Sequence, residues 1–205
     1  MMIKLPRLYA ILDVVRCQTA ELLIEFAQQL RDGGCRLMQY RNKSGNAREM
    51  LAQANVLRRV LERQVKLIMN DRADLAVTAQ FDGVHLGQND LSPQGARKVI
   101  GPELWLGVST HNPEQVEQAN QSSADYVAIG PVFETSSKKN PDPVVGLAGV
   151  RQARQSTSKL LVAIGGITPA NCKSVIDAGA DCVAVISDLL RGPAKSAEEF
   201  LRLLG

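Results

Sequence analysis

The chain has 205 residues, 45% hydrophobic and 22% charged, a composition that predicts one soluble globular domain over residues 1–205. Its formal net charge is only +3, with acidic and basic residues spread along the chain, so we expect no nucleic-acid partner, which would require a basic stripe. It has neither a run of 18 apolar residues nor a basic leader followed by an apolar stretch, so we expect no membrane span and no export signal.

Short apolar and β-branched runs alternate with segments of helical spacing along the chain. Apolar residues recur every three or four positions in 22–30 and 51–61, which indicates helices. The predicted strands are 7–12, 36–40, 66–70, 83–86, 104–108, 126–129, 160–164 and 182–186. Eight such alternations favour parallel strands with right-handed crossovers, so we predict an α/β fold, a single-domain (β/α)₈ TIM barrel. An open doubly wound sheet is the alternative, but its usual glycine-rich first turn is missing from 13–19.

Three capping side chains stand directly before prolines, in Ser92-Pro93, Asn112-Pro113 and Thr168-Pro169. Each pair predicts the start of a helix. A last helix is predicted at 195–204, after a short segment, 188–191, that Gly192-Pro193 ends. In a barrel, the residues between a strand end and the next helix line the catalytic face, so polar residues at these places are the site candidates.

Polar residues follow the second predicted strand. Gln39, Arg41 and Lys43 share one side of an extended segment because side chains alternate with period two. Two cations and an amide would then converge on one place. A solvated loop is the alternative interpretation.

Two carboxylates follow the third and fourth predicted strands, in Asn70-Asp71-Arg72 and at Asp90. Asp71 is explained equally well as a helix cap, whereas Ser92 already caps the next helix and leaves Asp90 spare. Carboxylates from adjacent strands that face Arg and Lys suit Mg²⁺, which prefers a few carboxylates together with substrate phosphate oxygens. We therefore predict a magnesium site at Asp71 and Asp90.

Hydroxyl and imidazole groups accompany the fourth and fifth predicted strands. Ser109 and Thr110 precede the Asn112 cap and are available either to a ligand or to their own backbone. His111 has no carboxylate neighbour in sequence, so it is expected to be a surface residue. His85 lies within a strand and is expected to be structural, with its polar atoms paired.

The longest connection, 130–143, follows the sixth predicted strand, and a loop of this length is usually functional. Its hydroxyls and Lys138 would close over a phosphorylated substrate, unless the loop is a disordered excursion. Phe133 indicates partial docking against the core.

Gly165 and Gly166 follow the seventh strand, and a short segment after Ser187 follows the eighth. This combination resembles the phosphate site of many barrels. A tight turn explains one glycine more easily than two. Asp188 would mildly oppose an anion at this place.

Taken together, these segments resemble the thiamine-phosphate synthase family from Leu8 to Ser187. Gln39-Tyr40-Arg41-Asn42-Lys43 resembles the family's Q-x-R-x-K, 70–72 its N-D-R and 83–90 its G-V-H-L-G-Q-x-D. The segments 107–111, 135–138 and 163–167 complete the series. Tyr40 stands where a smaller aliphatic residue is common, and Ser137 replaces a second threonine but keeps its hydroxyl.

The resemblance implies that the chain joins 4-amino-2-methyl-5-hydroxymethylpyrimidine diphosphate to a thiazole phosphate, often carboxylated, to give thiamine phosphate and diphosphate. The step would be dissociative and need no protein nucleophile. The resemblance implies a magnesium site at Asp71 and Asp90, and catalytic roles for Arg41, Lys43, Ser109 and Lys138. It assigns the pyrimidine diphosphate to Gln39, Arg41, Lys43, Asn70, Ser109 and Lys138, and the thiazole phosphate to Thr135, Ser137, Gly165, Gly166, Ile186 and Ser187.

Two other functions stay open at this point. A related thiazole tautomerase, an isomerase, needs the thiazole phosphate pocket and a histidine base but no metal site, so the presence of both carboxylates disfavours it. A non-catalytic phosphate-ligand sensor is the second alternative. The four cysteines form no CxxC pair, which predicts free thiols and a cytoplasmic protein, and the sequence leaves a homo-oligomer open.

Overall fold

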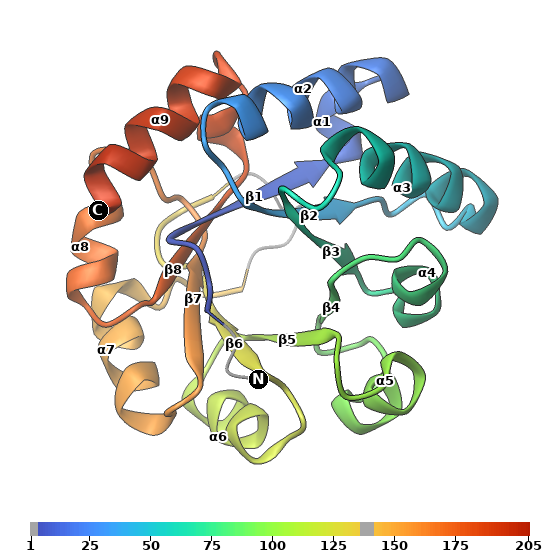
Figure 1. Ribbon diagram of the computed structural model, residues 1–205. Helices are drawn as coiled ribbons and strands as arrows, with labels where there is room; N and C mark the ends of the chain where they lie inside the picture. Colours follow the sequence, from blue (N-terminus) through green and yellow to red (C-terminus); the bar gives the residue numbers. More distant parts are fainter. Residues whose placement is uncertain (1–3, 136–141) are drawn as a thin grey trace.

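The computed structural model describes residues 4–135 and 142–205, in which eight parallel strands close into a barrel that helices surround (Figure 1). Each strand pairs with its neighbours in chain order, and β8 returns to β1. The strands are β1 Leu8–Asp13, β2 Leu37–Arg41, β3 Lys66–Asn70, β4 Gly83–Leu86, β5 Trp105–Thr110, β6 Tyr126–Ile129, β7 Leu160–Ile164 and β8 Cys182–Val185. The predicted (β/α)₈ barrel is therefore confirmed, with strand bounds that match or shift by one or two residues.

The helices form the outer layer between successive strands. They are α1 Val14–Cys17, α2 Ala20–Asp32, α3 Ala47–Leu61, α4 Ala73–Thr78, α5 Pro93–Ile100, α6 Pro113–Gln121, α7 Gly146–Ser156, α8 Cys172–Asp177 and α9 Pro193–Leu204, with a 3₁₀ helix, η1, at Ser187–Leu189. Within the part of the chain that the structure describes, no helix is long and apolar enough to span a bilayer.

Two of the three predicted helix starts are confirmed by their capping bonds. The Ser92 side chain accepts from the Gly95 N–H, and the Asn112 side chain accepts from the Gln115 N–H. The third prediction was wrong, because α8 begins at Cys172 and not at the proline after Thr168. There the Thr168 N–H donates to Asn171 Oδ1, which closes a turn before the helix starts.

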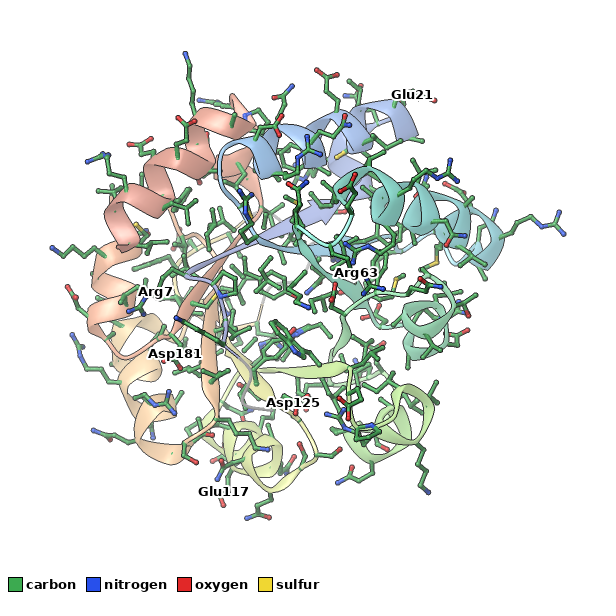
Figure 2. The ribbon with its side chains drawn as sticks, viewed as in Figure 1. Arg7, Glu21, Arg63, Glu117, Asp125 and Asp181 are labelled. Atoms are coloured by element: carbon green, nitrogen blue, oxygen red, sulfur yellow. The ribbon has the colours of Figure 1, made fainter. Side chains whose placement is uncertain are left out.

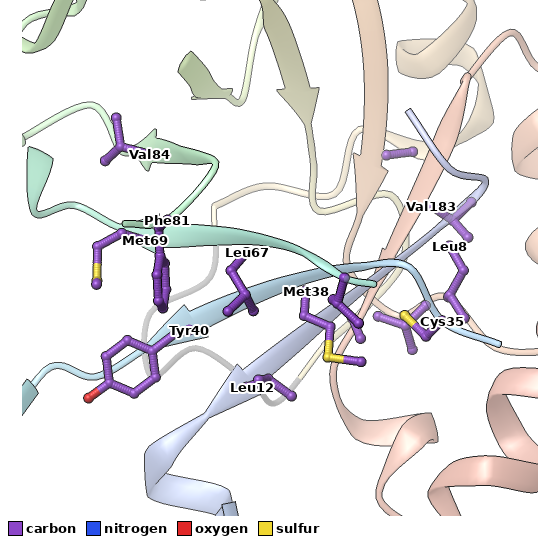
Figure 3. Packing of buried hydrophobic residues seen from close by; sticks show 14 of the residues in the cluster. Leu8, Leu12, Cys35, Met38, Tyr40, Leu67, Met69, Phe81, Val84 and Val183 are labelled. Carbon is purple, nitrogen blue, oxygen red and sulfur yellow. The ribbon is translucent and has the colours of Figure 1, made fainter. Parts of the chain in front are cut away.

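Alternation along the strands divides the buried side chains into two cores. Outward-facing residues such as Leu12, Met38 and Leu67 pack between the barrel and its helices (Figure 3). Inward-facing residues fill the amino-terminal half of the barrel interior, among them Tyr9 and Tyr126. Toward the carboxyl ends the inward-facing residues become polar and border a cavity. The four cysteines are free, as expected, and all four are buried.

Candidate active site

A cavity of about 470 Å³ opens at the carboxyl ends of the strands. Twelve of the sequence-predicted site residues line it, so the fold brings them together from segments that lie far apart in the chain. These residues are Gln39, Arg41, Lys43, Asn70, Asp71, Asp90, Ser109, Thr135, Gly165, Gly166, Ile186 and Ser187. The other two, Ser137 and Lys138, lie outside the described residues.

The end of β2 places Gln39, Arg41 and Lys43 on the cavity side, as period-two alternation predicts. Gln39 is buried, so a solvated loop does not describe this segment. Arg41 Nη1 lies 2.8 Å from Asp13 Oδ2, at the end of β1. Asp13 was not predicted as a site residue, although its position as a polar residue at a strand end was a usable signal. Lys43 Nζ forms an ion pair with Asp71 Oδ2.

Asp71 does not cap the helix that follows it. The N-cap of α4 is Arg72, which makes no side-chain capping bond, so the capping alternative is wrong. Asp71 has a φ of 64°, in the left-handed region that non-glycine residues adopt at a cost. Strained backbone of this kind concentrates at functional sites.

The carboxylates of Asp71 and Asp90 lie close enough to influence each other. Burial raises the pKa of Asp71, the hydrogen bond from Lys43 opposes this effect, and the neighbouring Asp90 carboxyl raises the pKa further. Asp90 Oδ2 also accepts from the Gly87 N–H at 2.7 Å, which holds it at the mouth of the cavity. Both carboxylates therefore face the same space.

The donor set fits a divalent cation that favours oxygen ligands. Among the described residues no cluster of three or more His, Cys, Asp or Glu side chains forms a complete protein cage. Mg²⁺ needs no such cage, because it binds through one or two carboxylates and takes its other ligands from substrate phosphates and water. Beside this pair, Asn70 is buried, and its Nδ2 has no hydrogen-bond partner within the described residues. This amide is a donor available to an acceptor in the cavity.

Both histidines line the cavity. The expected pairing of His85 is confirmed, since Nδ1 lies 3.0 Å from the Tyr126 hydroxyl and Nε2 lies 2.8 Å from Ser109 Oγ. Burial lowers the pKa of His85 to about 4, although the Asp90 charge opposes this effect, so the ring is neutral at pH 7.

The expectation that His111 is a surface residue was wrong. Its Nδ1 lies 2.6 Å from the Gly130 carbonyl oxygen, and its Nε2 lies 3.5 Å from Asp142 Oδ2. The orienting carboxylate comes from a distant part of the chain, so the residues next to His111 in the sequence do not signal it. The Thr110 hydroxyl, in contrast, donates to the Ala128 carbonyl oxygen. Of these two neighbouring hydroxyl residues, Ser109 is therefore the one that lines the cavity.

The glycine-containing wall of the cavity follows β7. Gly165 and Gly166 have φ values of 103° and 63°, which glycine adopts readily. A Cβ at Gly166 would also lie 2.5 Å from the Glu134 carbonyl oxygen, in the loop that follows β6. Both turn geometry and close packing therefore require glycine here. In the same loop, Phe133 packs against the core, which confirms its predicted docking.

Tyr40, which departs from the family pattern, lies outside the barrel. Its hydroxyl donates to Gln53 Oε1 in α3, and the residue does not border the cavity. The departure therefore does not change the shape of the pocket.

Comparisons with known proteins agree on one family. Residues 8–189 match the family model described as thiamine monophosphate synthase. The chain is 59% identical to a thiamine-phosphate synthase of Koribacter versatilis, over 98% of this chain and 97% of that protein. It is 43% identical to the thiamine-phosphate synthase of Chloroflexus aurantiacus, over 88% of this chain and 83% of that one. A solved structure of a thiamine phosphate pyrophosphorylase from Pyrococcus furiosus superposes with a TM-score of 0.86 at 32% identity, covering 97% of this chain and 95% of the other.

Proposed function

Since the chain belongs to the thiamine monophosphate synthase family, we propose that it joins 4-amino-2-methyl-5-hydroxymethylpyrimidine diphosphate to a thiazole phosphate, as a transferase of thiamine biosynthesis. The bond between the pyrimidine methylene carbon and the diphosphate oxygen breaks, and its electron pair leaves with diphosphate. A carbon–nitrogen bond to the thiazole nitrogen forms and gives thiamine phosphate. With a carboxylated thiazole, CO₂ leaves as well.

The observation that carries this proposal is one cavity with two different walls, each suited to a phosphorylated half. The wall from β2 to β5 carries cations, carboxylates and the unpaired Asn70 amide, and the wall after β7 and β8 carries glycine backbone and a hydroxyl. We assign the pyrimidine diphosphate to Gln39, Arg41, Lys43, Asn70 and Ser109. We assign the thiazole phosphate to Thr135, Gly165, Gly166, Ile186 and Ser187, and the sequence-based roles of Ser137 and Lys138 stay predictions.

The residues of the first wall stabilise the departing diphosphate with fixed positive charge. Arg41 is held in place by Asp13, and Lys43 is held by Asp71. We propose that Asp71 and Asp90 hold Mg²⁺, which when bound supplies further positive charge to the leaving group. Preorganised charges of this kind are sufficient for a dissociative step, so no protein nucleophile is needed.

The test is to mix the purified protein with both phosphorylated halves, with and without Mg²⁺, and to measure thiamine phosphate and released diphosphate. We expect product with Mg²⁺ and a rate loss of about a hundredfold in Asp71→Asn and in Asp90→Asn, because charge stabilisation by the metal is worth several kcal/mol. Asp74→Asn is the matched control, since Asp74 is exposed in α4, pairs with Arg72 and does not border the cavity.

Full rates in Asp71→Asn and Asp90→Asn would refute the metal assignment. A wild-type protein that binds both halves but forms no product under either condition would refute the synthase and favour a sensor.

We also propose that the protein acts in the cytoplasm on these small molecules. Its four free, buried thiols suit a reducing compartment.

A further inference from the structure

A chain of hydrogen bonds crosses the barrel interior and borders the cavity. Gln39 Nε2 lies 2.9 Å from the Tyr9 hydroxyl, and the Tyr9 hydroxyl lies 3.2 Å from that of Tyr126. The Tyr126 hydroxyl lies 3.0 Å from His85 Nδ1, and His85 Nε2 lies 2.8 Å from Ser109 Oγ. We call these five residues the relay. Its two ends, Gln39 and Ser109, line the cavity, as do Tyr9 and His85, and the three residues between the ends are buried.

The donor at one end sets the direction of every bond in the relay. An amide nitrogen only donates, so the Tyr9 oxygen accepts from Gln39, and the Tyr9 proton is directed to the Tyr126 oxygen. The Tyr126 proton then goes to His85 Nδ1, which leaves the imidazole proton on Nε2, directed at Ser109. Ser109 Oγ is thus an acceptor within the relay, and its own proton is available to the cavity.

The protonation states needed for this direction are those that burial favours. Burial lowers the pKa of His85, so its ring carries a single proton at neutral pH. Burial also raises the pKa values of Tyr9 and Tyr126, so both hydroxyls keep their protons.

Gly107 makes room for the middle of the relay. It pairs with Tyr126 in the register of β5 and β6, and a Cβ at Gly107 would lie 2.0 Å from Tyr126 Cζ. The Tyr126 ring also stacks on His85, with ring centres 5.5 Å apart. The phenol is therefore fixed in its place by its neighbours.

We propose that Tyr9, Tyr126 and His85 are positioning residues that give Gln39 and Ser109 opposite hydrogen-bonding polarity toward the substrate. Gln39 presents its carbonyl oxygen as an acceptor, and Ser109 presents its hydroxyl as a donor. This combination matches an aminopyrimidine edge, which offers an amino group beside a ring nitrogen. If the Gln39 amide turned over, every bond of the relay would reverse, so the two ends exchange polarity only together. The proposal rests on the proposed function, because it takes the substrate from there.

The first experiment measures the tautomer of His85 by ¹⁵N NMR of the imidazole. The chain has only two histidines, so a His111→Gln variant assigns the spectrum. We expect the proton of His85 on Nε2 in the wild-type protein, and a changed tautomer ratio in Tyr126→Phe. A wild-type proton on Nδ1 would overturn the proposal. This readout needs no turnover, so it stands apart from any failure of the synthase assignment.

The second experiment compares Tyr126→Phe with Tyr40→Phe, the same change at a buried tyrosine outside the relay and the cavity. In Tyr126→Phe we expect the KM for the pyrimidine diphosphate to rise about tenfold, since one or two hydrogen bonds lose their geometry, while the KM for the thiazole phosphate stays unchanged. Discrimination against an analogue with an oxo group in place of the amino group should fall by a similar factor. Equal behaviour of the two variants, or unchanged discrimination, would contradict the proposal.

Discussion

Arg41 and Lys43 are two cations on the same wall of the cavity, but they differ in how they are held. The side chain of Asp13 is 4% exposed and that of its partner Arg41 is 25% exposed. The side chain of Lys43, which pairs with Asp71, is 49% exposed. A largely buried carboxylate depends on its cation, whereas an exposed ion pair contributes little to stability.

We therefore predict that Arg41→Met and Lys43→Met both weaken binding of the pyrimidine diphosphate but affect folding differently. Arg41→Met should lower the free energy of unfolding by about 2 kcal/mol, because it leaves Asp13 buried without its cation. Lys43→Met should change it by less than about 1 kcal/mol. Urea unfolding of both variants measures the difference, and equal losses would contradict the distinct role of Asp13.

The elements are held together at the amino-terminal ends of the strands by three repeated clamps. In each, an aspartate lies directly before an even-numbered strand and accepts from a backbone N–H of the preceding, odd-numbered strand. The same aspartate pairs with an arginine of the helix that leads into that odd-numbered strand. The clamps are Asp82 with Leu67 and Arg58, Asp125 with Leu106 and Arg97, and Asp181 with Leu161 and Arg154. Figure 2 labels Asp125 and Asp181, and shows Arg7, which donates to the Asp181 carbonyl, beside the latter.

The clamp around Asp125 tests what these contacts contribute. Arg97 Nη2 lies 2.7 Å from Asp125 Oδ2, and the guanidinium also donates to the carbonyls of Gly101, Leu104 and Ser123. We expect Arg97→Met to lower the free energy of unfolding by about 2 kcal/mol, because several partly buried acceptors lose their donor. Arg151→Met, at an exposed position of α7, is the matched control and should unfold like the wild-type protein in urea. Equal stability of the two variants would show that the clamp is dispensable.

At the scale of the whole molecule, the barrel interior is apolar at one end and polar at the other, and His85 lies between the two. Burial lowers the pKa of this histidine from 6.5 to about 4. Between these two values the unfolded chain binds a proton that the folded chain does not, so stability rises with pH across this window. The contribution is complete above pH 6.5 and is lost as pH falls toward 4.

We predict that the free energy of unfolding of the wild-type protein falls by about 3 kcal/mol more than that of His85→Gln between pH 7 and pH 4. Subtracting the free energy of unfolding of His85→Gln from that of the wild-type protein removes the contribution of the carboxyl groups that both proteins retain. Urea unfolding of both proteins at several pH values measures this difference. A difference that does not vary with pH would contradict the burial of a neutral His85.

The sequence by itself determined the strands, the barrel and twelve residues of the cavity wall. These follow from local regularities, because a strand and the face that each of its residues takes are encoded by neighbours two positions apart. Gln39, Arg41 and Lys43 could be placed together for this reason, and Asp71 and Asp90 because adjacent parallel strands end on one face.

Only the tertiary structure decided which of these groups contact one another. Tyr9 and Tyr126 are 117 residues apart, Asp13 and Arg41 are 28 apart, and neither pairing has a local signature. The contact between Tyr9 and Tyr126 arises when the barrel closes and inward-facing residues of β1 and β6 meet across its axis. The contact between Asp13 and Arg41 depends on the register in which β1 and β2 pair. The start of α8 was predicted wrongly for a related reason. Whether the helix follows Thr168 or Asn171 depends on the hydrogen bond from the Thr168 N–H to the Asn171 side chain, which composition does not reveal. Side chains that meet across a closed barrel are selected by its geometry, which no short stretch of chain contains.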